Sequence, residues 1–204
     1  MSATFPGEPR MARRDRAAVP VPEPLDPHVT SVPTVDAMND RRIRSPLTPE
    51  EKREVWGEFA GREEEYLDEV QQRWGDSTAY EQSAKRVAAY GREQWERINR
   101  DNAAIEARIR ELMDAGEDPS GEAAMDVAEA QRRHIARWFY DMTHEFHVRK
   151  SDLYVDDPRF RAGVETNTRP GAAEWLRTAI RANAARAARA SGTAGTAGAP
   201  DPSG

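Results

Sequence analysis

WERINRDNAAIEARIRELMDAG, residues 95–116, is the stretch of the chain that decides its fold. Its large apolar residues recur at spacings of three, seven, four and three, and they are Trp95, Ile98, Ile105, Ile109 and Leu112. These spacings place side chains on one face of an α-helix, because 3.6 residues complete a turn. The sequence therefore predicts a long amphipathic helix that ends at Gly116. Asn102 interrupts the apolar stripe, and we expect it either to hydrogen-bond to a partner or to face a cavity.

The segments on both sides of this helix have the same period. Thr48-Pro49-Glu50-Glu51 predicts a helix start, since it combines a capping hydroxyl, proline at the first helical position and Glu three residues after Thr. We expect this helix to run through Trp56 and Phe59. Further helices are predicted through Tyr66 to Trp74, from Ser77 to about Tyr90, from after Pro119 to Met142, and from about Gly171, with a short turn capped at Asp157. No segment alternates with the period of two that a half-buried strand requires. We expect an all-α fold of about six or seven helices.

Both ends of the chain have compositions that disfavour a packed core. Nine of the 14 prolines lie at or before Pro49, and the last 14 residues read SGTAGTAGAPDPSG. Such segments bury too little apolar surface to offset the entropy of ordering the chain. We therefore expect disordered tails at residues 1–45 and 191–204 around one domain at residues 46–190, which contains all five tryptophans and all five tyrosines.

Composition excludes several classes of function. The net charge of −6 disfavours binding to nucleic acid, which rests on clustered Lys and Arg. Without cysteine the chain has no disulfide, thiolate nucleophile or Cys-based metal site. No apolar run approaches the ~18 residues of a membrane span, and no phosphate loop, dinucleotide motif or nucleophile elbow occurs. We expect a cytoplasmic protein with no cofactor, no membrane contact and no direct nucleic-acid partner.

Two regions concentrate side chains suited to recognition. Three of the four histidines lie between positions 134 and 147 among aromatic and acidic residues, and the candidates there are His134, Trp138, Tyr140, Asp141, His144 and His147. Trp56, Phe59 and Tyr66 lie on N-terminal helices that Gly57 and Gly61 weaken. A flexible flap beside an aromatic wall suits a flat, ring-rich ligand. Taken singly, each aromatic residue is more often part of a core. Asn102 completes the candidate site.

A metal-dependent enzyme is the rival interpretation. His144-Glu145-Phe146-His147 differs from the HExxH zinc motif, because its histidines are three rather than four residues apart. Asp141, His144 and His147 can nevertheless share a helical face and hold a metal. The ordinary alternative is that these side chains hydrogen-bond to each other and to the backbone at a helix junction. We favour ligand binding without a metal and without catalysis.

Five segments resemble, in order and spacing, the antibiotic-recognition domain of TipA-type regulators: LTPEEKREVWGEF, QQRWGDSTAY, RRHIARWFYDM, HEFHVRKSDLYVDDPRF and AEWLRTAIRANA. The resemblance spans nearly all of Pro46 to Ala184. It implies a compact, globin-like helical domain that binds thiopeptides and other large peptide-like antibiotics in a deep cleft. It also implies that residues 47–74 form a lid that orders on binding, in agreement with the glycine-weakened helix.

The sequence departs from this family at two places. Members join the domain to a MerR-type DNA-binding part, whereas a proline-rich segment precedes Leu47 here, so we expect a free-standing protein that sequesters or senses an antibiotic. The alternative is a ligand-sensing subunit that contacts a regulator protein through its tails. Members that trap thiopeptides covalently have a cysteine where Arg149 stands, and Met142 replaces another. We therefore expect noncovalent binding. We also expect Lys150 to be exposed and protonated, so that its amine reacts slowly at best.

Overall fold

The computed structural model describes residues 43–196, and this part of the chain forms eight α-helices and one 3₁₀ helix, with no strand. The elements are α2 (Pro49–Trp56), η1 (Gly57–Gly61), α3 (Glu63–Trp74), α4 (Thr78–Val87), α5 (Arg92–Asp114), α6 (Glu122–Trp138), α7 (His144–Asp156), α8 (Pro158–Asn167) and α9 (Ala172–Thr196). The all-α expectation is confirmed. None of these helices is both long and apolar enough to cross a membrane.

The first helix begins where its capping signal predicts and ends earlier than expected. Thr48 Oγ1 accepts a hydrogen bond from the Glu51 N–H at 3.2 Å, and the Glu51 carboxylate accepts one from the Thr48 N–H at 2.8 Å. α2 stops at Trp56 because Gly57 adopts a φ of +61°, in the left-handed region that glycine tolerates. Phe59 therefore lies on η1, whereas the sequence predicted one continuous helix.

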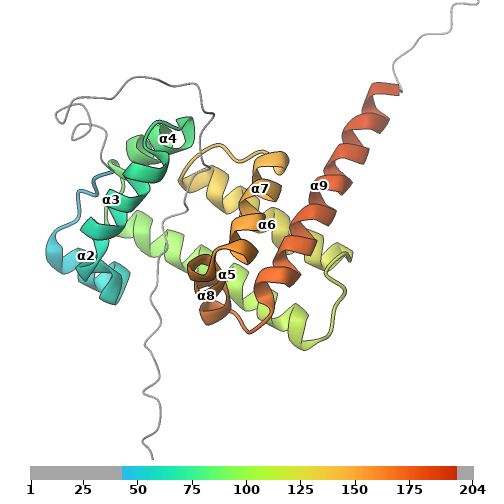
Figure 1. Ribbon diagram of the computed structural model, residues 1–204, viewed down its shortest axis with the longest axis horizontal. Helices are drawn as coiled ribbons and strands as arrows, with labels where there is room; N and C mark the ends of the chain where they lie inside the picture. The colour runs from blue at the N-terminus through green and yellow to red at the C-terminus, as the bar shows by residue number, and fades with distance from the viewer. Residues whose placement is uncertain (1–42, 197–204) are drawn as a thin grey trace, which may run out of the picture.

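The ordered part extends beyond the expected domain limits at both ends. Ile43 is buried in the core, and its N–H lies 3.4 Å from the Tyr80 hydroxyl oxygen. At the other end α9 continues to Thr196 and projects from the body of the molecule (Figure 1). The rest of the two predicted tails, residues 1–42 and 197–204, lies outside the described residues.

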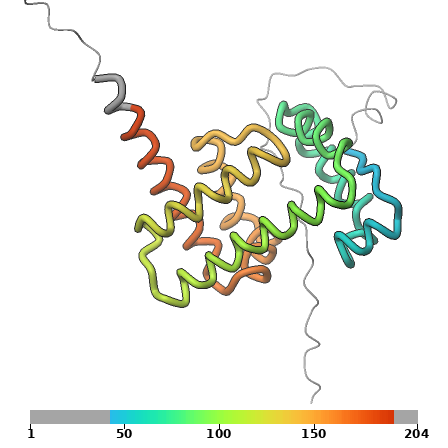
Figure 2. The backbone as a smooth tube through the Cα atoms, turned by 180° about the vertical axis from the view of Figure 1, so that it is seen from behind, coloured from blue at the N-terminus to red at the C-terminus, as the bar shows by residue number. Residues whose placement is uncertain are grey.

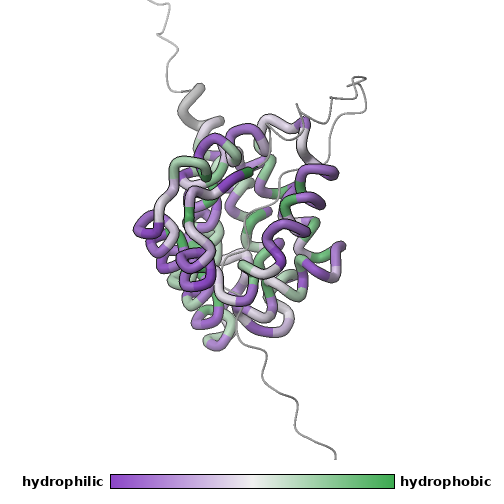
Figure 3. Tube along the Cα trace, turned by 90° about the vertical axis from the view of Figure 1, so that its left-hand side faces the viewer, coloured by the Kyte–Doolittle hydropathy of each residue, from purple (hydrophilic) through white to green (hydrophobic). Residues whose placement is uncertain are grey.

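Helix α5 joins two groups of packed helices (Figures 1 and 2). Around its first half, Trp95 and Ile98 pack in a core cluster with residues of α2, α3, α4 and the end of α6. Around its second half, Ile109 and Leu112 pack with α6, α7 and α9 in another cluster. Hydrophobic and hydrophilic residues are interspersed along the helical turns of the chain, as expected for helices that bury one face (Figure 3). The predicted α5 stripe is therefore confirmed and serves two cores.

The segment after α6 differs most from expectation. α6 ends at Trp138 rather than Met142, and the chain leaves the helical path until Thr143 caps α7 by accepting the Phe146 N–H at 3.1 Å. Asp157 caps a ten-residue helix, α8, with Pro158 at its first position, where the sequence predicted only a turn. With α7 and α8, the number of α-helices in the described part of the chain exceeds the predicted six or seven.

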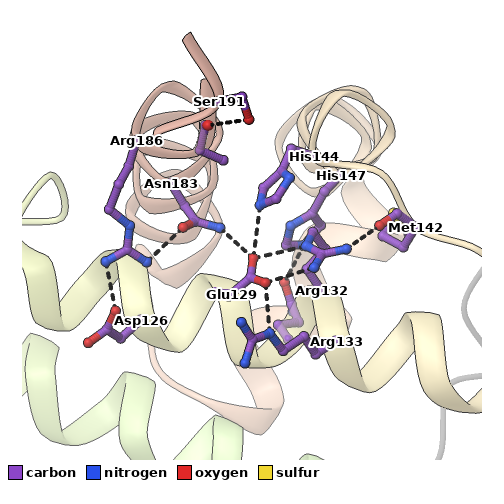
Figure 4. Close-up of polar contacts among 12 residues, drawn as sticks. Asp126, Glu129, Arg132, Arg133, Met142, His144, His147, Asn183, Arg186 and Ser191 are labelled. Carbon is purple, nitrogen blue, oxygen red and sulfur yellow. Dashed lines mark hydrogen bonds and ion pairs between the residues drawn. The ribbon is translucent and has the colours of Figure 1, made fainter. Parts of the chain in front are cut away.

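The Glu129 carboxylate joins α6, α7 and α9 (Figure 4). It pairs with Arg132 at 2.7 Å and Arg133 at 2.8 Å on its own helix, with His144 Nε2 of α7 at 3.0 Å, and with Asn183 Nδ2 of α9 at 2.9 Å. Partial burial raises the pKa of this carboxyl, but the hydrogen bonds from Arg132, Asn183 and Arg133 outweigh it and hold the pKa far below its ordinary value. The three helices therefore meet at a stable anion.

We expect Glu129→Gln to lower the free energy of unfolding by about 2 kcal/mol, because hydrogen bonds to a charged group are among the strong ones and the charged donors would lose their partner. Urea unfolding at pH 7 measures this loss. Glu145→Gln is the matched control, since Glu145 is an exposed carboxylate on α7 that pairs only with exposed Arg149 in the described structure. Equal losses in the two variants would contradict the proposed importance of Glu129.

Candidate functional site

A cleft of about 460 Å³ lies where the two core clusters meet. Its walls come from η1, α3, α5, α6, α7, α8 and the start of α9. The apolar and aromatic lining consists of Phe59, Tyr66, Val70, Trp74, Trp95, Ile98, Ile105, Ile109, Ile135, Phe139, Tyr154, Phe160, Val164 and Leu176. Apart from Gly163, the remaining lining residues are polar or charged. A concave site in which apolar and aromatic side chains surround polar groups is the usual form of a small-molecule site.

Charged residues surround the cleft on α3 and α8. Arg159 of α8 pairs with Glu69 of α3 through two nitrogen–oxygen contacts of 2.8 and 2.9 Å, and Arg73 contacts the same carboxylate at 3.2 Å. The hydrogen bond from Arg159 holds the pKa of Glu69 below its ordinary value. Arg159 is 64% exposed, so solvent screens this link between the two sides of the cleft.

Two buried basic side chains also line the cleft, His134 and Lys150. Burial lowers the pKa of His134, and it lowers the pKa of Lys150 to about 7. The expectation that Lys150 is exposed was therefore wrong: only 4% of it is accessible, because its position on α7 faces the interior. At neutral pH its amine is present in both protonation states.

His147, next to this region, is buried and neutral. Its Nε2 lies 3.0 Å from Oε1 of Gln131, which itself lines the cleft. Burial is the main reason that the pKa of His147 falls to about 3, and the positive charges of Lys150 and Arg132 lower it further. Its imidazole is thus a neutral hydrogen-bonding group throughout the physiological range.

Four of the ten predicted site residues line the cleft: Phe59, Tyr66, Asn102 and His134. The Phe59 and Tyr66 rings meet edge to face at 5.2 Å between centroids. Asn102 Nδ2 donates to Glu106 Oε1 at 2.8 Å while the residue faces the cleft, so both expectations for it hold.

Three predicted aromatic residues lie in the core instead. Trp56 packs edge to face on Trp95 with 5.1 Å between centroids, beneath the cleft wall. Trp138 is buried against Tyr90, whose hydroxyl donates to the Trp138 carbonyl at 2.7 Å. Tyr140 is fully buried. Because α6 ends at Trp138, the chain turns and directs Phe139 to the cleft in place of its two neighbours.

The three proposed metal ligands point to different partners. Asp141 is exposed and pairs with Arg86 at 2.7 Å, His144 pairs with Glu129, and His147 pairs with Gln131. Across residues 43–196 no group of three or more His, Cys, Asp or Glu side chains is arranged to hold a metal ion. These side chains form hydrogen bonds and ion pairs with neighbouring residues, as the alternative interpretation expects. None of the three lines the cleft.

Sequence reasoning missed several lining residues, above all Phe139, Lys150, Tyr154, Arg159 and Phe160. A signal for the last two was present, because Asp-Pro is a helix-start pair and the residues after it lie on the first turn of a helix. No comparable signal marks Lys150, since a lysine is usually exposed.

Comparison with known proteins shows that the chain is similar in sequence to a family of antibiotic-recognition domains. The model of the TipAS antibiotic-recognition domain matches residues 66–183. The HTH-type transcriptional activator TipA of Streptomyces coelicolor is 43% identical over 148 residues, which are 72% of this chain and 57% of that protein. The activator mta of Bacillus subtilis is 29% identical over 156 residues, 76% of this chain and 56% of mta. The chain thus spans little more than half the length of these curated relatives.

A solved structure shares both sequence and fold with this chain. It is TipAS in complex with nosiheptide, from a thiopeptide antibiotic multidrug resistance system of Streptomyces lividans. The match covers 71% of this chain and 99% of that one, with 43% identity and a TM-score of 0.64. Identity at this level together with the shared fold places the two domains in one structural class.

We expect His147→Gln to flatten the dependence of stability on pH. The unfolded chain protonates His147 near pH 6.5, whereas the folded chain does so only near pH 3, so the unfolded state binds more protons between these values. Stability is then full above pH 6.5 and falls toward pH 3 by up to about 1.4 kcal/mol per pH unit. Urea unfolding at pH 4.5, 5.5 and 6.5 tests this, and the same slope in both proteins would refute it.

Proposed function

The chain belongs to the TipAS antibiotic-recognition domain family, and from this premise we propose that it binds a bulky peptide-like antibiotic noncovalently in the cleft between α3, α5 and α8. The observation that carries the proposal is the cleft of about 460 Å³, with its aromatic lining, at the junction of two cores. The TipAS of S. lividans was solved with the thiopeptide nosiheptide, which supports a ligand of that class.

Within residues 47–74, the segment that we propose as a lid, residues 59–74 contribute to one wall of this cleft. η1 and α3 contribute Phe59, Tyr66 and Trp74 to its lining. A cleft of this volume suits a drug-sized molecule, so a large macrocyclic peptide has to displace part of the wall. The glycines at both ends of η1 offer hinge points, and the exposed Glu69–Arg159 pair adds little resistance to opening.

Two roles follow from such binding. The first role is sequestration. A protein that binds a toxic compound without transforming it lowers the free concentration of that compound, and the amount held rises with protein concentration. Sensing for transcription is the second candidate, and the observation in its favour is that the curated relatives TipA and mta are transcriptional activators. In that role the domain would act through a regulator protein rather than by contacting DNA with the residues described here.

We expect nosiheptide to bind with measurable affinity, and Phe59→Ala and Tyr66→Ala each to weaken binding about tenfold, which corresponds to about 1.4 kcal/mol. Isothermal titration calorimetry measures both values. Phe146→Ala is the control, because Phe146 is a partly buried aromatic that packs on Tyr140 outside the cleft. After denaturation, intact mass should equal that of the unmodified chain, since it has no cysteine.

Failure of the wild-type protein to bind nosiheptide would remove support for a thiopeptide ligand. Equal weakening by all three substitutions would place the ligand elsewhere. A stoichiometric adduct would contradict the noncovalent mode.

We expect residues 47–74 to exchange amide hydrogens faster than α6 in the free protein, and to become protected on binding of nosiheptide. The reason is that η1 has no buried residue, and that α3 begins with three consecutive glutamates. Hydrogen–deuterium exchange with mass spectrometry measures both states, with α6 as the internal reference. Protection of residues 47–74 equal to that of α6 without ligand would rule out the lid.

A further inference from the structure

Three carboxamide side chains line the cleft from two helices that pack against each other, α5 and α6. They are Asn99, Asn102 and Gln131, which we call the amide trio, and all three are half-buried. Asn99 and Asn102 are three residues apart, so they share one face of α5. A carboxamide has both a donor and an acceptor group, and withdrawing either from water without a hydrogen bond is costly.

The two asparagines are held by their amide nitrogens. Asn99 Nδ2 donates to the carbonyl oxygen of Val55 at 2.9 Å, and Asn102 Nδ2 donates to Oε1 of Glu106 at 2.8 Å. A carbonyl oxygen and a carboxylate only accept hydrogen bonds, so the side-chain atom that faces each of them has to be the nitrogen. Within residues 43–196 neither Oδ1 oxygen accepts a hydrogen bond. Helix α5 therefore offers two acceptors.

Gln131 is held in the opposite sense. Its Oε1 lies 3.0 Å from Nε2 of His147, whose Nδ1 is buried without a hydrogen-bond partner in the described structure. A neutral imidazole has one proton, and a buried N–H without an acceptor is rarer than an acceptor without a donor. The proton of His147 therefore lies on Nε2 and is donated to Gln131. The amide nitrogen of Gln131 has no acceptor among the described residues, so α6 offers a donor.

The trio comes from neighbouring turns of the two helices. Burial is the main influence on the pKa of His134 and lowers it, while the negative charge of Asp101 raises it. Asp101 on α5 thus lies near His134 on α6. Asn102 directly follows Asp101, and Gln131 precedes His134 by about one helical turn. The acceptors of α5 and the donor of α6 therefore lie in the same part of the cleft.

We propose that the amide trio determines ligand specificity, by selecting ligands that present a secondary amide to the wall formed by α5 and α6. The inference rests on the proposed function, because it assigns a ligand chemistry to the same cleft. A secondary amide has one N–H and one C=O. Its N–H donates to an asparagine oxygen of α5, and its C=O accepts from the Gln131 amide nitrogen. An ester of the same shape lacks the N–H and leaves the asparagine oxygen without a donor.

The test compares N-benzyl-2-naphthamide with benzyl 2-naphthoate, which share their rings and carbonyl group and differ in one N–H. Isothermal titration calorimetry on the full chain gives the ratio of the two affinities. We expect the wild-type protein to prefer the amide by at least about tenfold, as for the loss of one hydrogen bond to a desolvated acceptor.

The double variant Asn99→Ala, Asn102→Ala should bring this ratio within about twofold of unity. Alanine preserves α5 because it is the best helix former, and a purely structural effect would weaken both ligands alike and leave the ratio unchanged. Asn167→Ala is the matched control and should keep the wild-type ratio. Asn167 is a cleft-lining asparagine on α8, whose carbonyl accepts from Arg110, about two turns beyond Asn102.

Gln131→Glu tests the donor. It keeps an oxygen for the His147 N–H and removes the amide nitrogen, so it should weaken both ligands, since both present a carbonyl oxygen. Unchanged affinity for both ligands would overturn the role of Gln131. If the double asparagine variant does not fold, the two single variants decide the question, because at least one of them has to lower the ratio.

The outcomes separate this inference from the proposed function. Binding of nosiheptide together with equal affinities for the amide and the ester overturns the amide trio and leaves the antibiotic-binding function standing. An amide preference that the double variant removes, without binding of nosiheptide, supports the trio and overturns the thiopeptide ligand. A ratio lowered as much by Asn167→Ala, or lack of binding by both naphthyl compounds, overturns the inference.

Discussion

The carboxylate of Glu129 is the constraint on which the arrangement of the second half of the chain depends. An anion placed between helices needs several hydrogen-bond donors, and the Glu129 carboxylate has partners on α6, α7 and α9. By fixing α7 against α6, it also fixes the depth at which His147 and Lys150 are buried. The burial that lowers the pKa values of these two side chains thus depends in part on a carboxylate that does not line the cleft.

The cleft itself is a consequence of a long helix shared by two cores. The apolar stripe of α5 runs through both core clusters. Its middle part lies between them and is the part that faces the cleft. Ile105 and Asn102 lie between the two clusters and face the cleft. A polar residue at that position is tolerated because Asn102 faces the cleft and its amide donates a hydrogen bond to Glu106. The interruption of the stripe, visible in the sequence, therefore marks the boundary between the cores.

The helical period predicted the fold because a stripe of apolar residues specifies which face is buried. It predicted only part of the cleft, since periodicity does not reveal where a helix ends. The stop of α6 at Trp138 rotates the following residues, so that Phe139 lines the cleft while Tyr140 is buried elsewhere. The His144 to His147 segment looked like a site because its residues are chemically versatile. Their partners, Glu129 and Gln131, lie on another helix and were not foreseeable from local spacing.

Helix α9 extends from the cleft to the outside of the molecule. Leu176 lines the cleft near its first turn, and the helix continues beyond the body to Thr196 (Figure 1). At 1.5 Å per residue, the 20 residues between these positions make a rod of roughly 30 Å. A tilt of about 5° at the cleft would displace the far end by about 2.6 Å. The far end of α9 would therefore amplify a small tilt of the whole helix, and it is the natural point at which to attach a reporter.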